Sequence, residues 1–252
     1  MKIVVCVKQV QNLPGQIQLL ADGSAVDSDF VERDFNEPDR YAVEEALRMR
    51  DAASGGEVIA VTLGDDTADD AAREALAMGA DRALRVAGPG GSLDPLEIAR
   101  GLARAIDEME PDLVVTGIQS TDAAQQATGP ALAAMLNWPC LAGVTAVLVG
   151  DDKVEAQREL DGGRIEVVEA TLPVVLVVQT GLNQPRYGTF KDKMKAKKAD
   201  IQIIAAGDHD EPSGLTLRRV FFGGARSENM ETIEGGAEVV AARLMELVRA
   251  VT

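Results

Sequence analysis

Short runs of aliphatic and β-branched residues recur along the first half of the chain, and a segment with helical spacing follows each run. The runs are residues 2–8 (KIVVCVK), 57–63 (EVIAVTL), 82–86 (RALRV) and 112–117 (DLVVTG). Continuous apolar runs of this length are typical of strands buried on both faces in a parallel sheet. Strands that alternate with helices through right-handed crossovers predict an α/β fold with a doubly wound parallel sheet, Rossmann-like in its layers.

The helices are expected to connect and follow these strands. They are predicted from the turn at Asn36-Glu37-Pro38-Asp39 to Gly55-Gly56, over residues 67–78, from an entry marked by Ser92, Asp94 and Pro95 to about residue 109, and over residues 128–136. Pro at a first helical position and acidic residues in a first turn are favourable helix starts.

The pattern changes after residue 140. Successive strands are predicted within residues 144–180 (VTAVLVG, KVEAQREL, RIEVVEA and PVVLVVQT), joined by Gly-Asp and Asp-Gly-Gly turns. They predict an antiparallel extension of the sheet or a hairpin pair on its edge. An earlier hairpin is predicted over residues 16–27, around Asp22-Gly23.

The last third has less regular patterning. Residues 183–198 are predicted to form a loop with little apolar periodicity, residues 213–229 an irregular extended segment, and residues 238–250 an amphipathic helix. An irregular arm followed by a helix suits a tail that embraces another subunit, and a poorly ordered C-terminus is the alternative.

The charge balance excludes several partners. A net charge of −16 argues against nucleic acid and against anionic membrane surfaces. No apolar run approaches 18 residues, so we expect neither a membrane span nor a signal peptide. Cys6 and Cys140 lie in apolar segments and are interpreted as buried thiols of a reducing compartment, the cytoplasm or an organelle matrix.

Catalytic motifs are absent from the sequence. It contains no GxGxxG, no GxxxxGK[ST] and no GxSxG, and its one histidine, His209, lies in an acidic stretch that we interpret as a solvated loop. Asp161-Gly162-Gly163 is better explained as a hairpin turn than as a metal site. Because the two cysteines are not clustered and no nucleophile–base pair is present, we expect a binding or carrier protein rather than an enzyme with its own chemistry.

Ligands of open α/β sheets bind beyond the carboxyl ends of the strands, where the strand order reverses. Two strand ends stand out, Cys6-Val7-Lys8 and the loop from Gly117 to Gly129, which is small, polar and nearly uncharged. Because this loop leads into a helix, backbone N–H groups are predicted to hold a nucleotide phosphate. The loop's hydroxyl and amide side chains would add hydrogen bonds: Ser120, Gln125, Gln126 and Thr128. An ordinary capped loop is the alternative.

A basic cluster interrupts the acidic chain. Residues 190–198 (FKDKMKAKK) hold five lysines within eight residues. A solvated helix face is the usual interpretation of such a run. Alternatively, Phe190 and Met194 anchor a partner while the lysines steer its acidic surface.

Several motifs together resemble those of electron transfer flavoprotein β subunits. The signature lies in Asn183-Gln184-Pro185-Arg186-Tyr187 followed by Met194-Lys195-Ala196-Lys197-Lys198. Further similar motifs are residues 42–46, 75–82, 117–129, 137–139, 158–163 and 171–173. The resemblance runs in order over about residues 2–200 and is looser beyond.

The resemblance implies the small, non-catalytic subunit of a heterodimer, with a fold similar to adenine nucleotide alpha hydrolases. Such a subunit holds a structural AMP, while FAD lies mainly on the α subunit near the cleft between the two. It implies transient contact with a flavoprotein dehydrogenase and a quinone oxidoreductase, which carries electrons toward the respiratory quinone pool. Residues 1–200 would form the nucleotide-binding domain, including the recognition loop 183–198, and residues 201–252 the arm and helix that contact the partner subunit.

The same resemblance assigns site residues. The residues assigned to AMP and the flavin cleft are Cys6, Asn36, Glu37, Pro38, Asp39, Leu63, Gly117, Ile118, Gln119, Ser120, Thr121, Asp122, Ala123, Ala124, Gln125, Gln126, Ala127 and Thr128. Those assigned to partner docking are Phe190, Lys191, Lys193, Met194, Lys195, Lys197 and Lys198, with leucine common in the family where Phe190 stands here.

Two alternatives stay open. Some family members hold a second FAD in this subunit and bifurcate electrons, and a free-standing nucleotide-binding domain would share the sheet. The loop at residues 125–129, residues 137–139 and the lysine-rich segment resemble the AMP branch. Asn36-Glu37 and residues 117–120 look closest to members that serve methylamine-type dehydrogenases.

Overall fold

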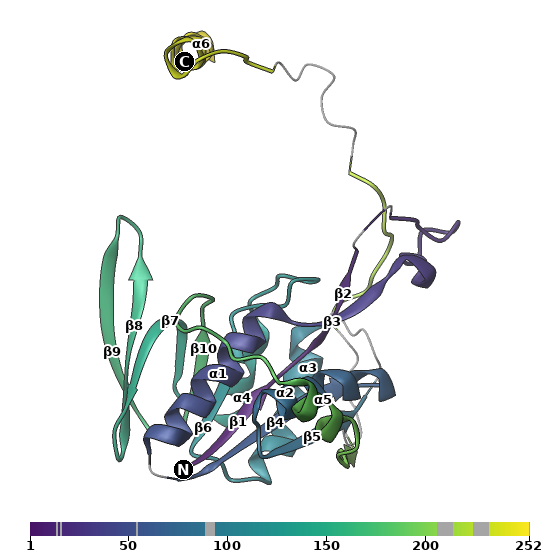
Figure 1. The fold of residues 1–252 in the computed structure, drawn as a ribbon, viewed down its shortest axis with the longest axis vertical. Helices are drawn as coiled ribbons and strands as arrows, with labels where there is room; N and C mark the ends of the chain where they lie inside the picture. Colours follow the sequence, from purple (N-terminus) through teal and green to yellow (C-terminus); the bar gives the residue numbers. More distant parts are fainter. Residues whose placement is uncertain are drawn as a thin grey trace.

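A large, mostly parallel sheet forms the centre of the protein (Figure 1). The computed structural model describes residues 1–13, 15, 17–53, 55–88, 94–205, 214–223 and 232–251. Over these residues the sheet has nine strands, in the order β11-β5-β4-β1-β6-β10-β7-β8-β9. Their bounds are β1 Lys2–Cys6, β4 Glu57–Gly64, β5 Arg82–Ala87, β6 Leu113–Gly117, β7 Cys140–Val149, β8 Lys153–Leu160, β9 Arg164–Thr171, β10 Val174–Val178 and β11 Gln202–Ala205.

The strand order reverses at β1. The chain passes from β1 to β4 and then to β5 on one side, and it returns to place β6 on the other side of β1, with each of these pairs parallel. This is the doubly wound arrangement predicted from the sequence. The carboxyl ends of β1 and β6 therefore border the point where a ligand crevice is expected.

Helices cover both faces of the sheet. On one face Ile3 and Val5 pack with α1 (Glu37–Ala52) and α2 (Asp69–Met78), and α2 follows the short 3₁₀ helix η2 (Asp66–Ala68). On the other face Val4 and Cys6 pack with α3 (Pro95–Asp107) and α4 (Thr128–Leu136). Alternate residues of β1 thus pack into two separate apolar clusters, one on each face of the sheet. This is expected of a parallel strand that is buried on both faces.

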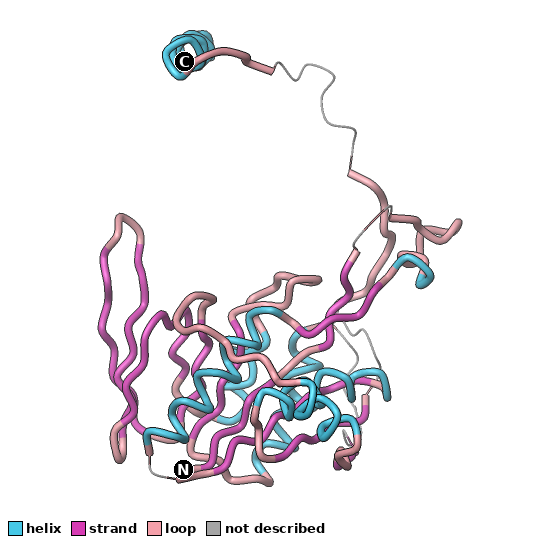
Figure 2. The backbone as a smooth tube through the Cα atoms, in the orientation of Figure 1, coloured by secondary structure: helices cyan, strands magenta, loops and turns pink. Residues whose placement is uncertain are grey.

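The predicted antiparallel extension is confirmed for three of its four strands. β7 pairs with β8 and β8 with β9, and this hairpin projects beyond the rest of the sheet (Figure 2). The placement of residues 173–180 with it is wrong, because β10 lies between β6 and β7 and is parallel to both. All five residues of β10 are buried, and a strand without a polar face needs cover on both sides, which only the sheet interior provides.

Several elements were not predicted. β2 (Gln9–Asn12) and β3 (Glu32–Phe35) form a separate antiparallel ribbon, with the 3₁₀ helix η1 (Ser28–Phe30) before β3. The hairpin expected over residues 16–27 is reduced to one bridge, Leu19 to Val26, with Gly23 at its turn. β11 adds a parallel edge strand beside β5, so the sheet extends to residue 205.

The loop predicted over residues 183–198 is wrong in its second half, which forms the helix α5 (Phe190–Lys197). Its periodicity is weak because it buries little of its surface. Thr189 and Asp192 nevertheless form a reciprocal capping box, which favours a helix start locally.

The C-terminal helix α6 (Ala237–Val251) confirms the predicted amphipathic helix, and it lies apart from the α/β body in Figure 1. The described part of the arm, residues 214–223, has no regular secondary structure, as predicted. Ser92, His209 and the rest of the predicted irregular segment lie outside the described residues. Among the helices that the structure describes, none is both long and apolar enough to cross a membrane.

Candidate functional site

A cavity of about 400 Å³ opens at the carboxyl ends of β1, β4 and β6, where the strand order reverses. The end of β1, the β2–β3 ribbon, the loop after β6 and the start of α4 surround it. Ligand pockets of proteins measure about 300–1,000 Å³, so this cavity lies near the small end of that range.

Asn36 and Asp39, at the start of α1, join two sides of this cavity. The side chain of Asn36 leaves its own helix uncapped and instead donates to the carbonyl of Gln119 at 2.9 Å and accepts from the N–H of Thr121 at 3.1 Å. Asp39 accepts from the backbone N–H of Lys8 at 2.8 Å. The loops after β1 and β6 are therefore fixed relative to each other by the first turn of α1.

Glycines keep backbones in close contact around the cavity. A Cβ atom on Gly129, in the first turn of α4, would lie 2.8 Å from Thr116 Oγ1 and 2.6 Å from a methyl carbon of Val177. Such distances leave no room for a side chain. The first turn of α4 can approach the ends of β6 and β10 only because residue 129 is glycine.

The loop after β6 is held in an uncommon conformation. Lys8 Nζ contacts Asp122 Oδ1 at 2.6 Å and Ser120 Oγ at 3.2 Å, so the end of β1 holds the loop. Ala124 and Gln126 have φ values of 51° and 54°, in the left-handed region. Non-glycine residues in this region cost free energy and occur preferentially at ligand sites, where the surrounding structure holds them.

The loop ends at a helix N-terminus that faces the cavity. Ala127, the N-cap residue of α4, provides no side-chain hydrogen bond to the helix start. The first N–H groups of a helix have no acceptor within the helix. Nearby, Thr116 Oγ1 is buried without a hydrogen-bond partner among the described residues, and Thr116 lines the same cavity. Uncapped N–H groups beside an unpaired buried hydroxyl make this end suitable for a polar, anionic group.

Two lining groups, Cys6 and Asp39, have raised pKa values. Burial raises the pKa of the Cys6 thiol to about 12, and the neighbouring Asp39 adds to this. Burial also raises the pKa of Asp39 to about 7, against the hydrogen bonds from Asn36, Lys8 and Gly117 that favour its charged form. The surface beside Cys6 and Asp39 therefore suits a neutral aromatic or apolar group better than a second negative charge.

The pKa of Asp122 is lowered, in contrast to the raised pKa of Asp39. Its burial disfavours the carboxylate, but hydrogen bonds from Lys8 and Ser120 outweigh that penalty and lower its pKa. The contact between Lys8 and Asp122 is thus an ion pair at neutral pH, and the lysine's charge is already engaged.

The structure brings most of the residues assigned from the sequence to one cavity. Those that line it are Cys6, Asn36, Asp39, Leu63, Gly117, Ile118, Gln119, Ser120, Asp122, Ala123, Gln125, Gln126, Ala127 and Thr128. The other four lie beside it rather than on its surface. Glu37 is exposed, Pro38 packs behind Gly117, Thr121 bonds to Asn36, and Ala124 provides a left-handed turn.

Sequence reasoning missed several lining residues, among them Ile98 and Leu102 of α3 and, at and after the end of β4, Gly64, Asp65, Thr67 and Ala68. Gln9, Gln11 and Arg33 reach the cavity from the β2–β3 ribbon, whose strands were not predicted. Thr116 could have been noticed, because a hydroxyl near the end of a fully apolar strand needs a partner when it is buried. Of the described residues, no group of three or more potential ligands could hold a metal ion.

The residues assigned to partner docking form a separate surface on α5. Phe190 is 82% exposed and Met194 43% exposed. The lysines of the segment, Lys191, Lys193, Lys195, Lys197 and Lys198, are all exposed as well. Figure 1 places α5 beside α2, on the body of the protein. The exposure of Phe190 and Met194 leaves their side chains available to a partner.

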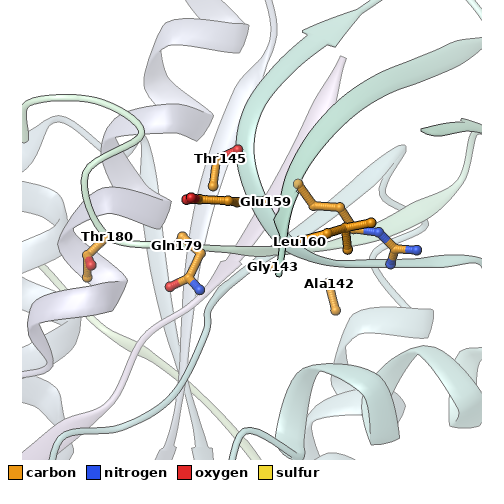
Figure 3. Close-up of a pocket in the computed structure, with 8 residues that line it drawn as sticks. Ala142, Gly143, Thr145, Glu159, Leu160, Gln179 and Thr180 are labelled. Carbon is orange, nitrogen blue, oxygen red and sulfur yellow. The ribbon is translucent and has the colours of Figure 1, made fainter. Parts of the chain in front are cut away.

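A second cavity, of about 350 Å³, lies where β7 leaves β10 and pairs with β8. Figure 3 shows Thr145, Glu159 and Gln179 grouped around it. Arg158, which also lines it, is already paired with Glu166. None of the described buried polar atoms without a partner belongs to this cavity, so it points to no particular ligand.

Comparison with known proteins gives one consistent result. A family profile described as "Electron transfer flavoprotein domain" matches residues 25–209. The chain is 35% identical to the electron transfer flavoprotein subunit beta of Methylophilus methylotrophus, with 98% of each chain covered. It is 38% identical to the mouse and 37% identical to the human protein of the same name, over 82% of each chain.

Proposed function

Because this chain belongs to the electron transfer flavoprotein family as a β subunit, with an electron-transfer role, we propose that it binds AMP in the cavity beside α4 and helps a partner α subunit to hold FAD. Its relatives are named as electron carriers rather than as enzymes. The chain would accordingly transform no substrate by itself.

The observation that carries the AMP proposal is the presence of two features in one cavity. The uncapped N-terminus of α4 and the unpaired hydroxyl of Thr116 suit a phosphate or ribose oxygen. Beside Thr116 on the neighbouring strand, the neutral thiol of Cys6, with the side chain of Leu63, offers an apolar wall for a base. A volume of about 400 Å³ favours a mononucleotide over a dinucleotide.

FAD would lie mainly on the α subunit, where it supplies the electron-accepting group of the complex. This chain has few rings for stacking on a flavin, since aromatic residues make up 3% of it. Of the two basic residues that line the cavity, Lys8 is already paired with Asp122. The residues of this chain would hold AMP and exclude water from the cleft. Residues 201–252 would contact the α subunit.

The surface of α5 would receive a flavoprotein dehydrogenase. Exposed Phe190 and Met194 supply apolar anchors, and the surrounding lysines attract an acidic partner to a protein of net charge −16. Electrons would then pass to a quinone oxidoreductase. A methylamine-type dehydrogenase as donor and a cytoplasmic location stay predictions.

Counting nucleotides in the purified complex tests these assignments. The chain is co-expressed with its α partner, the heterodimer is denatured, and the released nucleotides are quantified. One AMP and one FAD per heterodimer support the proposal. Two FAD and no AMP would assign the cavity to a bifurcating subunit, and a stable colourless monomer that never pairs would identify a free-standing nucleotide-binding domain.

A further inference from the structure

The segment that leads into α5 is tied to α1 by buried charge. Glu44 of α1 has a side chain only 7% exposed, and it accepts three hydrogen bonds from Arg186. The backbone N–H of Arg186 donates at 3.1 Å, and its guanidinium donates to the two carboxylate oxygens at 2.7 and 2.9 Å. A bidentate pair of this kind fixes orientation as well as position.

Two neighbouring residues strengthen this attachment. Asn183 Nδ2 donates to the carbonyl of Tyr41 at 3.0 Å and to Glu45 at 2.9 Å. Gly188 lies directly on α2, where a Cβ atom would stand 2.5 Å from the carbonyl oxygen of Ala77. The chain is therefore held at several points before α5 begins.

Arg73 of α2 holds the other end of α5. Its guanidinium Nη1 donates to the carbonyls of Ala196 at 2.9 Å, Lys197 at 3.1 Å and Ala199 at 2.9 Å. The last carbonyls of a helix lack hydrogen-bond donors within the helix and carry partial negative charge. One guanidinium beside them provides both donors and positive charge. This matters for α5 because a helix of eight residues is marginal by itself.

These contacts contribute little to the core. Within the described helix α5, only Ala196 is buried. The apolar residues Phe190 and Met194 are instead exposed, one helical turn apart on the same face of α5. The contacts therefore fix a helix whose own apolar surface remains open.

We propose that Arg73 is a positioning residue for partner docking: together with the Glu44–Arg186 pair, it holds α5 so that Phe190 and Met194 are presented in fixed geometry to an acidic-rimmed apolar pocket of the flavoprotein dehydrogenase. This rests on the docking role proposed above. A helix already ordered before encounter loses less conformational entropy on binding, so its anchors bind more tightly.

The test uses Arg73→Ala in the complete heterodimer, with the dehydrogenase as electron donor. The KM for this flavoprotein is expected to rise ~5- to 50-fold, the range of weaker interface residues. The kcat and the AMP and FAD content should stay the same. Arg73→Lys should recover part of the loss, because it keeps a cation near the same carbonyls.

A matched arginine controls for general destabilisation. Arg82 also bridges separate segments, through Glu57 and Gln202, without contacting α5. Arg82→Ala should leave the KM unchanged.

A double-mutant cycle separates positioning from a merely structural role. If Arg73 acts through Phe190, Arg73→Ala should have little further effect in a Phe190→Ala background. Equal effects in both backgrounds, or a KM unchanged by Arg73→Ala while Phe190→Ala raises it, would overturn the inference and leave the docking proposal intact. A KM that neither substitution changes would reject the docking proposal itself.

Discussion

A Cβ atom on Gly117 would stand 2.4 Å from Asp39 Oδ1. The carbonyl carbon of Pro38 lies 2.8 Å from the same point. The carboxyl end of β6 therefore packs directly on the first turn of α1, and this contact forms the back of the cavity. No side chain fits at residue 117 unless β6 and α1 separate.

Replacing Gly117 by alanine should therefore damage both stability and nucleotide binding. Overpacking of this kind typically costs about 1–3 kcal/mol, here with displacement of the Asp39 carboxyl that supports the loop after β1. Urea unfolding of the heterodimer and the AMP content after purification measure the two effects. Gly150→Ala is the control, because its Cβ would meet its nearest atom at an ordinary 3.4 Å. Wild-type AMP content in Gly117→Ala would contradict the packing argument.

Asp39 should make stability depend on pH. Burial raises its pKa from 3.8 to about 7, so between these values the folded state binds more protons than the unfolded state. Its contribution to stability is therefore fully present below about pH 4 and is lost as the pH rises through about 7, at a cost of a few kcal/mol. The difference in unfolding free energy between wild type and Asp39→Asn should fall across this window and level off above it. A constant difference from pH 4 to 8 would contradict the assignment.

The predictable part of the cavity is the part that strands and local signals define. Buried apolar runs located β1, β4 and β6, and the small polar loop from Gly117 to Gly129 located the helix start. The β2–β3 ribbon escaped prediction because QVQN and ERDF lack an apolar face, so only their pairing with each other makes them strands. That is why the contribution of Arg33 to the cavity was invisible in the sequence.

The predicted position of β10 was wrong for a different reason. The turn residues within 150–173 predicted the local connections correctly. They do not determine which strands pair with each other in the sheet. Full burial of residues 174–178 was the signal that mattered, and it favours an interior parallel position. Long-range pairing of this kind is decided by the core rather than by local sequence.

Cys6 should be inert toward thiol reagents in the folded protein. With its pKa at about 12, the thiolate fraction at pH 8 is ~10³-fold below that of an unperturbed cysteine, and the side chain is buried. Burial raises the pKa of Cys140 too, but this thiol is partly exposed. Iodoacetamide labelling followed by mass spectrometry should show Cys140 modified first, with the two rates converging in urea. Equal rates in the native protein would place Cys6 in a different environment.

Lys8 should be needed for nucleotide binding although its charge is already paired. Lys8→Met removes the contacts that hold Asp122 and Ser120, and it leaves the Asp122 carboxylate unpaired near the anion site. AMP affinity is expected to fall ~10-fold or more, in line with the loss of a hydrogen bond to a charged group. Lys2→Met is the control, at the start of β1, where Nζ donates to the carbonyl of Met109. Isothermal titration of the AMP-depleted heterodimer gives both values, and equal affinities would argue against a supporting role for Lys8.

Phe190 gives the sharpest test of docking, because it is 82% exposed and supports nothing inside this subunit. Phe190→Ala should slow reduction by the dehydrogenase while leaving the FAD content and thermal stability unchanged, since losing a desolvated aromatic anchor costs on the order of 2 kcal/mol. Phe190→Leu should retain most of the rate, because it keeps a large apolar side chain. Raising the ionic strength should weaken the encounter of both proteins, since the lysines around Phe190 act at long range. If the alanine variant is reduced at the wild-type rate at every salt concentration, the dehydrogenase binds elsewhere, and the exposed face of α5 needs another partner.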